Sequence, residues 1–428
     1  MSTAAIILIS SMIILLILGV PIGVSMALSS VIAISFMART PMIVVPQRMF
    51  TAIDSFPFMA IPFFVLAGEF MLQGGLSKRL VNLAEALMQN IKGGLALVSI
   101  VTCAFFGAIS GSALATTAAI GGVMYPEMKD RGYNEEFSAT VQAAGGTLGI
   151  LIPPSIPLVV YGVIANVSIA NLFLAIIGAG VIMALAYCLV AYYLVVKGGM
   201  AATVTARKIP VAPAFVKAIW GLLSPVIILG GIYTGMFTPT ESAIVATVYS
   251  LFVGKFIYRE LDGRNFIEAI KKSCVTTAGI MFIIASATLF GWLMTALKVP
   301  VWVSNSLLKF VDGPIGFLLL INFIFLVAGM FMETASIILL TVPLLLPVAV
   351  GLGVDPLHFG IISVTNLSLG LITPPFGASL FVASGMSGVS IMRLYRRVLV
   401  FLIGGLAATL LVTYVPGLTL GLLTLFGR

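Results

Sequence analysis

A Pro-Pro pair interrupts two long apolar segments of this chain, and the two interruptions share a pattern. One reads GILIPP over Gly149 to Pro154, and the other, 221 residues later, reads GLITPP over Gly370 to Pro375. Consecutive prolines remove backbone donors and clash with the preceding turn, so each helix is expected to break there. In a bilayer, unwound backbone persists only where protein or a water-filled cavity satisfies its amides and carbonyls. Those groups bind small ions and carboxylates, so each break is a candidate site.

Composition places the chain in a membrane. Apolar residues make up 61% of it and charged residues 8%, and the mean hydropathy is +1.21. These values indicate a polytopic membrane protein. Its net charge of +8 fits basic cytoplasmic loops and does not indicate nucleic-acid binding. The first apolar segment, Ala4 to Leu18, has no cleavage signal and is expected to be retained.

The apolar segments predict an all-α protein with ten membrane crossings. Eight are plain crossings near residues 4–18, 22–37, 57–73, 170–195, 219–236, 240–256, 274–297 and 398–416. The other two are the broken helices at 137–165 and 357–388. Two segments, 93–126 and 314–350, consist of short apolar pieces around a polar tip and are interpreted as re-entrant hairpins. Amphipathic stretches at 76–90 and 299–312 are expected along the interface.

The two halves of the chain repeat this order. A shift of 221 residues aligns Pro153 with Pro374 and Pro126 with Pro347, so we expect a first repeat over 1–196 and a second over 218–428. The connector between them, 197–217, is expected in the cytoplasm. Bases follow the first hairpin but not the second, and they follow the second broken helix but not the first. By the positive-inside rule the repeats are therefore predicted to be inverted, with a site at their interface.

Four motifs together resemble a known family. They are FGAISGS from Phe106 to Ser112, GGIYTGMFTPTE from Gly230 to Glu241, and the two Pro-Pro segments. With these motifs the chain resembles, over essentially its whole length, the large membrane subunit (M subunit) of tripartite ATP-independent periplasmic (TRAP) transporters.

The resemblance implies an elevator-type secondary transporter in the bacterial inner membrane. Sodium ions would drive uptake of a small organic acid, of the C4-dicarboxylate or sialic acid type, that a periplasmic substrate-binding protein delivers. It also implies a small four-helix membrane subunit, expected here as a separate chain because the 428 residues leave no room for it.

Polar and small residues at the two tips and two breaks are the predicted ligands, because helix ends there expose unpaired carbonyls and amides. For sodium they are Ser110, Gly111, Ser112, Gly145, Gly149 and Pro153 at one site, and Glu333, Thr334, Asn366, Gly370 and Thr373 at its mirror image. For the substrate they are Ser112, Thr116, Thr147, Pro154, Asn366 and Pro375. The alternative is that the small residues only let helices approach closely.

The isolated ionisable residues need separate interpretations. A carboxylate at a hairpin tip is costly in lipid, so Glu333 is interpreted as either an ion ligand or a helix cap. Glu69 is interpreted as a structural residue that hydrogen-bonds between helices, and Glu241 as a cap. His358, the one histidine, is expected to have an interfacial role.

Other classes of protein fit less well. A serine hydrolase using Ser110 or Ser112 lacks a nearby base and a Gly-x-Ser-x-Gly elbow, and a primary pump lacks a phosphate-binding loop. The alternative that stays open is a stand-alone anion or proton-coupled transporter of a related hairpin fold.

Overall fold

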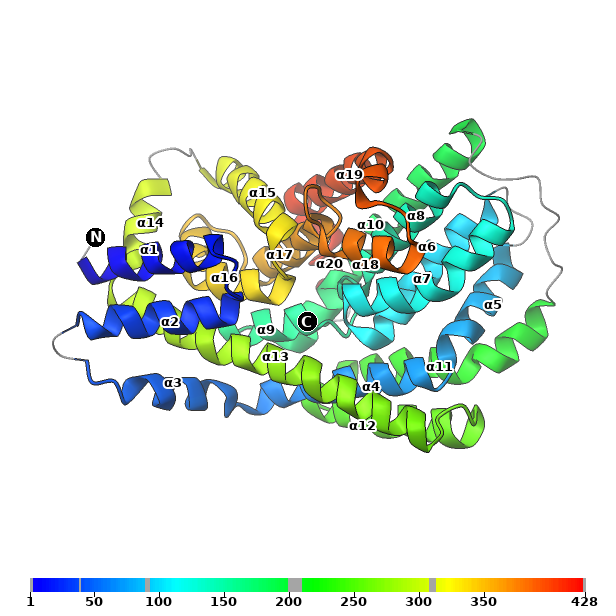
Figure 1. Cartoon of the computed structure of the whole chain (residues 1–428), viewed down its shortest axis with the longest axis horizontal. Helices are drawn as coiled ribbons and strands as arrows, with labels where there is room; N and C mark the ends of the chain where they lie inside the picture. Colours follow the sequence, from blue (N-terminus) through cyan, green and yellow to red (C-terminus); the bar gives the residue numbers. More distant parts are fainter. Residues whose placement is uncertain (1–2, 38–39, 89–92, 199–209, 308–312, 426–428) are drawn as a thin grey trace.

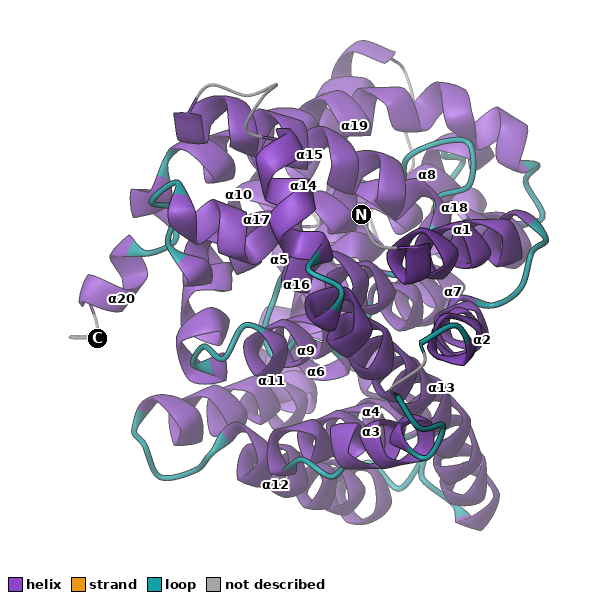
Figure 2. Ribbon diagram, turned by 90° about the vertical axis from the view of Figure 1, so that its left-hand side faces the viewer, coloured by secondary structure: helices purple, strands orange, loops and turns teal. Residues whose placement is uncertain are grey.

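A computed structural model describes residues 3–37, 40–88, 93–198, 210–307 and 313–425. These residues form helices and connecting turns, with no strand among them (Figures 1 and 2). Residues 199–209 of the predicted connector, the ends of both amphipathic stretches at 89–90 and 308–312, and the chain ends lie outside the described residues.

The helices run in the following order along the chain. The first half contains α1 (Thr3–Ile17), α2 (Ile22–Ser35), α3 (Val44–Ile53), η1 (Phe56–Met59), α4 (Ala60–Gln73), α5 (Leu76–Met88), α6 (Gly94–Ser110), α7 (Ala113–Asp130), α8 (Glu135–Thr147), η2 (Leu148–Ile150), α9 (Ile156–Ile164) and α10 (Ile169–Gly198). The second half contains α11 (Val211–Tyr233), α12 (Pro239–Phe252), η3 (Val253–Ile257), α13 (Gly263–Ala296), α14 (Val299–Leu307), α15 (Gly313–Phe331), α16 (Thr334–Gly351), α17 (Pro356–Gly370), α18 (Ala378–Ser387), α19 (Ile391–Tyr414), η4 (Pro416–Leu418) and α20 (Gly421–Leu425).

The structure confirms an all-α membrane architecture. Among the described residues, 8 helical segments are long and apolar enough to cross a bilayer. Six correspond to predicted plain crossings. The other two, α15 and α16, are the arms of the second predicted hairpin. Each arm is long enough to cross a bilayer, so the re-entrant form of this hairpin stays a prediction. Helices α1 and α2 are shorter apolar helices, and the total of ten crossings stays a prediction.

The secondary structure repeats with the offset found in the sequence. Helices α7 and α16 are both 18 residues long, and both their ends are shifted by 221 positions. The preceding helices α6 and α15 end at Ser110 and Phe331, which the same shift aligns. We call α6 with α7 the first hairpin and α15 with α16 the second hairpin. The predicted equivalence of the two hairpins therefore holds at their tips and along their second arms.

Both predicted helix breaks are present. Helix α8 stops at Thr147 and α9 starts at Ile156, while α17 stops at Gly370 and α18 starts at Ala378. The Pro153-Pro154 and Pro374-Pro375 peptide bonds are both cis. We call residues 148–155 the first break and 371–377 the second break.

Several helices start earlier than the predicted crossings. Helix α11 starts at Val211, within the predicted connector 197–217, and α19 starts at Ile391. The crossing predicted at 274–297 belongs to α13, which already begins at Gly263, where the Asp262 side chain accepts a hydrogen bond from the Asn265 amide, 2.7 Å away. Helix α3 was missed altogether. In the first half, the counterpart of the single helix α13 is split into α3 and α4, and Pro57 lies in the first turn of the intervening η1. Proline tolerates that position but interrupts a continuous helix.

Helix α5 joins two groups of helices through ion pairs. Arg79 on one side of it pairs with Glu260 at 2.7 Å, in the segment between α12 and α13. Glu85 on the same helix pairs with Arg131, which follows the first hairpin and also contacts Glu127 at 2.7 Å. One of these two groups contains α4, which packs against α12 and α13, and the other contains the first hairpin. The group with α4 lies along the lower side of Figure 1. We call these three helices with α11 the scaffold.

Glycines let each hairpin approach its break. A Cβ added at Gly107 in α6 would lie 2.8 Å from the Cα of Gly149, and one added at Gly329 in α15 would lie 2.9 Å from the Cα of Gly370. Both distances are shorter than real Cβ contacts allow. The close approach of the hairpin helices to the breaks therefore requires glycine at these positions.

We predict that Gly107→Ala lowers the free energy of unfolding of the detergent-solubilised protein by about 1 to 3 kcal/mol, because the added methyl group overpacks the contact with Gly149. Gly279→Ala is the matched control: Gly279 is also inside a helix, α13, and no atom lies within 4 Å of the position that an added Cβ would take. Melting followed by tryptophan fluorescence should show a lower transition temperature for the first variant only. Equal transition temperatures for both would contradict the close contact.

Candidate functional site

The tip of the first hairpin is a compact polar turn. Gly111 has a φ of +60°, a left-handed conformation that favours glycine. Ser112 begins α7 as its N-cap, and its hydroxyl accepts a hydrogen bond from the Ala115 amide. The Ser110 hydroxyl lies 2.8 Å from that of Thr116, which donates to the Ser112 carbonyl at 2.7 Å. These bonds fix the tip before any ligand binds.

This tip rests directly on the first break. The Ile156 amide at the start of α9 donates to the Gly111 carbonyl at 3.3 Å. A Cβ on Gly111 would lie 2.8 Å from the Pro154 carbonyl oxygen, and a Cβ on Gly149 would lie 2.5 Å from the Ser112 carbonyl oxygen. The unwound backbone of the break is therefore covered by the hairpin tip rather than by lipid.

The second hairpin repeats this arrangement with different chemistry. Glu333 takes the place of Ser112 as the N-cap, and its Oε2 accepts hydrogen bonds from the amides of Ala335 at 3.1 Å and Ser336 at 3.4 Å. The tip again contacts its break, because the Gly377 amide donates to the Met330 carbonyl at 3.1 Å. Glu333 thus has the capping role, and its carboxylate also faces a cavity.

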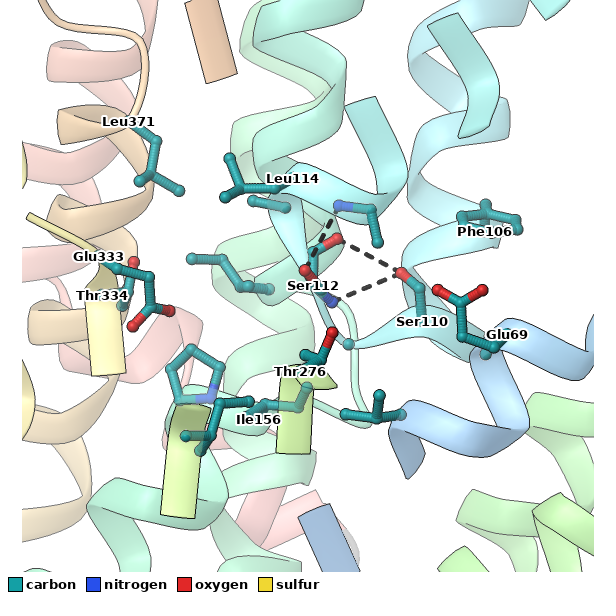
Figure 3. Close-up of a pocket in the computed structure, with 18 of the residues that line it drawn as sticks. Glu69, Phe106, Ser110, Ser112, Leu114, Ile156, Thr276, Glu333, Thr334 and Leu371 are labelled. Carbon is teal, nitrogen blue, oxygen red and sulfur yellow. Dashed lines mark hydrogen bonds between the residues drawn. The ribbon is translucent and has the colours of Figure 1, made fainter. Parts of the chain in front are cut away.

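A cavity of about 310 Å³ lies between the two tips and the scaffold (Figure 3). The first hairpin contributes Ser110, Gly111 and Ser112, and the second contributes Glu333 and Thr334. Glu69 of α4 and Thr276 of α13 complete its polar lining. Most of the remaining lining is apolar, as in typical small-molecule sites.

The ionisable side chains of this cavity are all acidic. Its ionisable lining residues are Glu69 and Glu333, and none of the described lining residues is basic. The amides at the start of α16 compensate Glu333. The buried Oε2 of Glu69 has no hydrogen-bond partner among the described residues. Those residues contain no group of three His, Cys, Asp or Glu side chains that could hold a transition metal.

The structure places the predicted residues in three different environments. The cavity is lined by Ser110, Gly111, Ser112, Glu333 and Thr334. Behind it, the glycines and prolines of the prediction lie in helix contacts or in the breaks: Gly145, Gly149, Pro153, Pro154, Gly370 and Pro375. Three hydroxyls bond locally: Thr116 within the tip, Thr147 to the Ala144 carbonyl at 2.8 Å, and Thr373 to the Leu369 carbonyl at 2.9 Å.

Asn366 lies apart from the cavity between the tips. Its side-chain amide donates to the backbone and side-chain oxygens of Asn322 in α15, at 2.9 and 2.7 Å. Both residues line a second cavity, of about 800 Å³, together with Thr409 of α19. The buried Oδ1 of Asn366 has no partner among the described residues. The structure therefore separates Asn366 from the tip residues with which it was predicted to act.

The scaffold residues Glu69 and Thr276 are the part of the cavity that was not predicted. A glutamate inside an otherwise apolar segment was the available signal for Glu69, but its Oε2 does not make the expected interhelix hydrogen bond. Glu241 is the expected cap, in a capping box with Thr238. His358 differs from its interfacial assignment: it is 3% exposed, and its Nε2 lies 3.1 Å from the Thr413 carbonyl.

Known proteins provide an independent comparison. Residues 9–418 match the family described as "Tripartite ATP-independent periplasmic transporter, DctM component". The chain is 44% identical to an isethionate TRAP transporter permease, DctMQ, of Oleidesulfovibrio alaskensis over 94% of its own length and 64% of that relative. It is 39% identical to a C4-dicarboxylate TRAP transporter large permease, DctM, of Vibrio cholerae, over 96% and 95% of the two chains.

A solved structure supports the same fold. The YdaH transporter of Alcanivorax borkumensis aligns with a TM-score of 0.66 over 86% of this chain and 87% of that one, at 15% sequence identity. The family match and the shared fold agree with one another over most of the chain. The chain belongs to the DctM component family of tripartite ATP-independent periplasmic transporters.

Proposed function

We propose that this protein carries out sodium-coupled secondary uptake of a small organic acid, with the cavity between the hairpin tips as its substrate site. The observation that supports this proposal most strongly is the acidity of the cavity: its described lining residues include two glutamates and no base. When these carboxyl groups are ionised, repulsion would exclude an organic anion unless cations entered with it. Coupled entry of sodium and substrate is what a symporter requires.

Oxygen atoms suited to sodium are present at both tips. The Thr334 hydroxyl is buried without a partner among the described residues, next to the Glu333 carboxylate. At the other tip, Ser110 and Ser112 provide hydroxyl and carbonyl oxygens. Hard cations prefer oxygen ligands of this kind. We assign one sodium site to each tip and its adjoining break.

The relatives suggest the partners and the setting. The name of the isethionate relative joins the M and Q components, and this chain spans 64% of that relative's length. We therefore propose that a small membrane subunit pairs with this chain, that a periplasmic binding protein supplies the substrate, and that the complex lies in the bacterial inner membrane. The proposed substrates are the C4-dicarboxylate and sialic acid types.

Unequal contacts in the two halves support inverted repeats and an elevator-like movement. In the first half, α4 meets the hairpin at its tip, since a Cβ on Gly68 would lie 3.2 Å from the Cα of Ser110. In the second half, the glycine contact between α13 and the hairpin lies far from the tip: a Cβ on Gly291 would lie 3.9 Å from Cγ of Pro343. Pro343 is about 13 Å along α16 from its start. If both hairpins had the same position relative to their scaffold helices, α4 and α13 would contact them at equivalent points. The unequal contacts therefore support a displacement of the hairpins relative to the scaffold.

The direction of the displacement follows from the predicted topology. The positive-inside rule predicts that the bases after the first hairpin are cytoplasmic, so that this hairpin enters from the cytoplasm and α4 ends there at Gln73. The hairpin tip lies beside Gly68, close to that end of α4. The second hairpin reaches deeper past its scaffold helix. We therefore propose that the hairpins and breaks form one moving body that is shifted toward the cytoplasm in this structure, and that the opposite shift exposes the cavity to the periplasm.

We predict that an inward sodium gradient drives substrate accumulation in proteoliposomes that contain this protein, its small subunit and the binding protein, with no ATP present. Replacing sodium by potassium on both sides should abolish accumulation of the radiolabelled acid. Uptake that persists in potassium would contradict sodium coupling. Uptake that persists without the binding protein would favour the alternative, a stand-alone transporter.

We predict that Glu333→Gln raises the sodium concentration for half-maximal uptake at least tenfold, because the amide can still cap α16 but no longer attracts a cation. Asp355→Asn is the matched control: Asp355 caps α17 in the same way, through the amides of Leu357 at 2.8 Å and His358 at 3.1 Å. Sodium titrations of initial uptake should separate the two variants. An equal sodium dependence in both would limit Glu333 to its capping role.

A further inference from the structure

We propose that Glu69 determines specificity by accepting a hydrogen bond from the substrate. The transported acid would then carry a donor, a hydroxyl or an ammonium group, in addition to its acid group. This inference rests on the proposed function, because it takes the cavity between the tips as the substrate site.

Glu69 is held against the cavity by the packing of its neighbour. Gly68 lets α4 approach the Ser110 backbone closely, and the next side chain, Glu69, then faces the cavity. Figure 3 shows Glu69 beside Ser110, with Glu333 on the opposite side of Ser112. The two carboxylates therefore lie on different sides of the space that a substrate would occupy.

The charged groups around Glu69 are already paired elsewhere. Lys272 of α13 binds Glu268 on the same helix at 2.9 Å. Across the cavity, Glu333 accepts amide hydrogen bonds from α16. No described residue donates to the buried Oε2 of Glu69. A carboxylate accepts up to four hydrogen bonds and donates none when ionised. The Oε2 of Glu69 is therefore an unsatisfied hydrogen-bond acceptor.

Glu69 lines the cavity of about 310 Å³, while its Oε2 is itself buried. Rotation of the carboxyl group about its last side-chain torsion, which is soft, would bring this oxygen to a donor on the substrate. Sites built to hydrogen-bond a substrate hydroxyl reject analogues that lack it far more strongly than apolar pockets reject a missing methylene, because the buried polar group is otherwise left unpaired. Glu69 belongs to the scaffold rather than to a hairpin. It would therefore test the substrate at a fixed position while the hairpins close around it.

The test uses two pairs of acids that differ by one hydroxyl group: isethionate against ethanesulfonate, and malate against succinate. Each acid is titrated, in sodium, against the thermal stability of the purified complex of this protein with its small subunit. In the wild-type complex, the hydroxy acid of at least one pair should stabilise at a concentration at least tenfold lower than its partner acid. Glu69→Gln, which keeps an acceptor oxygen, should retain at least a threefold preference.

Glu69→Met, which keeps the length of the side chain but removes its acceptors, should reduce the preference to less than twofold. Its transition temperature without ligand should be no lower than that of the wild type, because the unpaired buried oxygen is gone. Equal stabilisation by both members of each pair in the wild type, or an undiminished preference in Glu69→Met, would overturn the role of Glu69. Absence of sodium-dependent stabilisation by all four acids and by sialic acid would overturn the proposed function together with this inference.

Discussion

The fold depends on hydrogen bonds to the backbone amides and carbonyls that are freed where two helices unwind inside the membrane. Two helices of this protein stop at Pro-Pro pairs, and lipid offers no hydrogen bonds to the groups that are freed there. The structure supplies them from the hairpin tips: Ile156 donates to Gly111, and Gly377 donates to Met330. Each break therefore needs its hairpin, and each hairpin needs a glycine contact to come close enough. The cavity lies where the two tips, held in this way, approach the scaffold.

The sequence predicted the parts of this arrangement that follow from local chemistry. Tandem prolines stop a helix whatever surrounds them, and the shift of 221 residues carried the ends of α7 onto those of α16. Glu241 was recognisable as a capping residue from its place beside Pro239 at a predicted helix start, and the structure shows its partner to be Thr238. Helix α3 was missed because its short segment contains Pro46 and polar residues. Its counterpart at the start of α13 also lies outside the predicted crossing 274–297.

The composition of the site could be predicted only in part, because it depends on the direction of side chains. The tip residues line the cavity because the cavity lies between the two hairpin tips, and these residues form the turns at those tips. Thr147 and Asn366 belong to the same segments, but they are turned toward Tyr187 and Asn322, and a sequence repeat does not show which face of a helix meets which neighbour. Glu69 comes from a scaffold helix outside both tips and breaks. Its place in the cavity follows from tertiary packing at Gly68.

Movement of the hairpins as one body between inverted repeats is tested most directly by a contact that this structure lacks. Transposing the contact between Gly291 and Pro343 by 221 residues places it between the last turn of α4 and Gly122, and a Cβ added at Gly122 would have no atom within 4 Å. We predict that cysteines at Gly122 and at Leu72, which lies in that last turn and faces the cavity, with the native cysteines replaced, cross-link in membranes during turnover and thereby stop uptake until they are reduced. A pair at Gly291 and Pro343 should cross-link without turnover. No cross-link between the first pair during active uptake, while the second pair forms normally, would contradict the account.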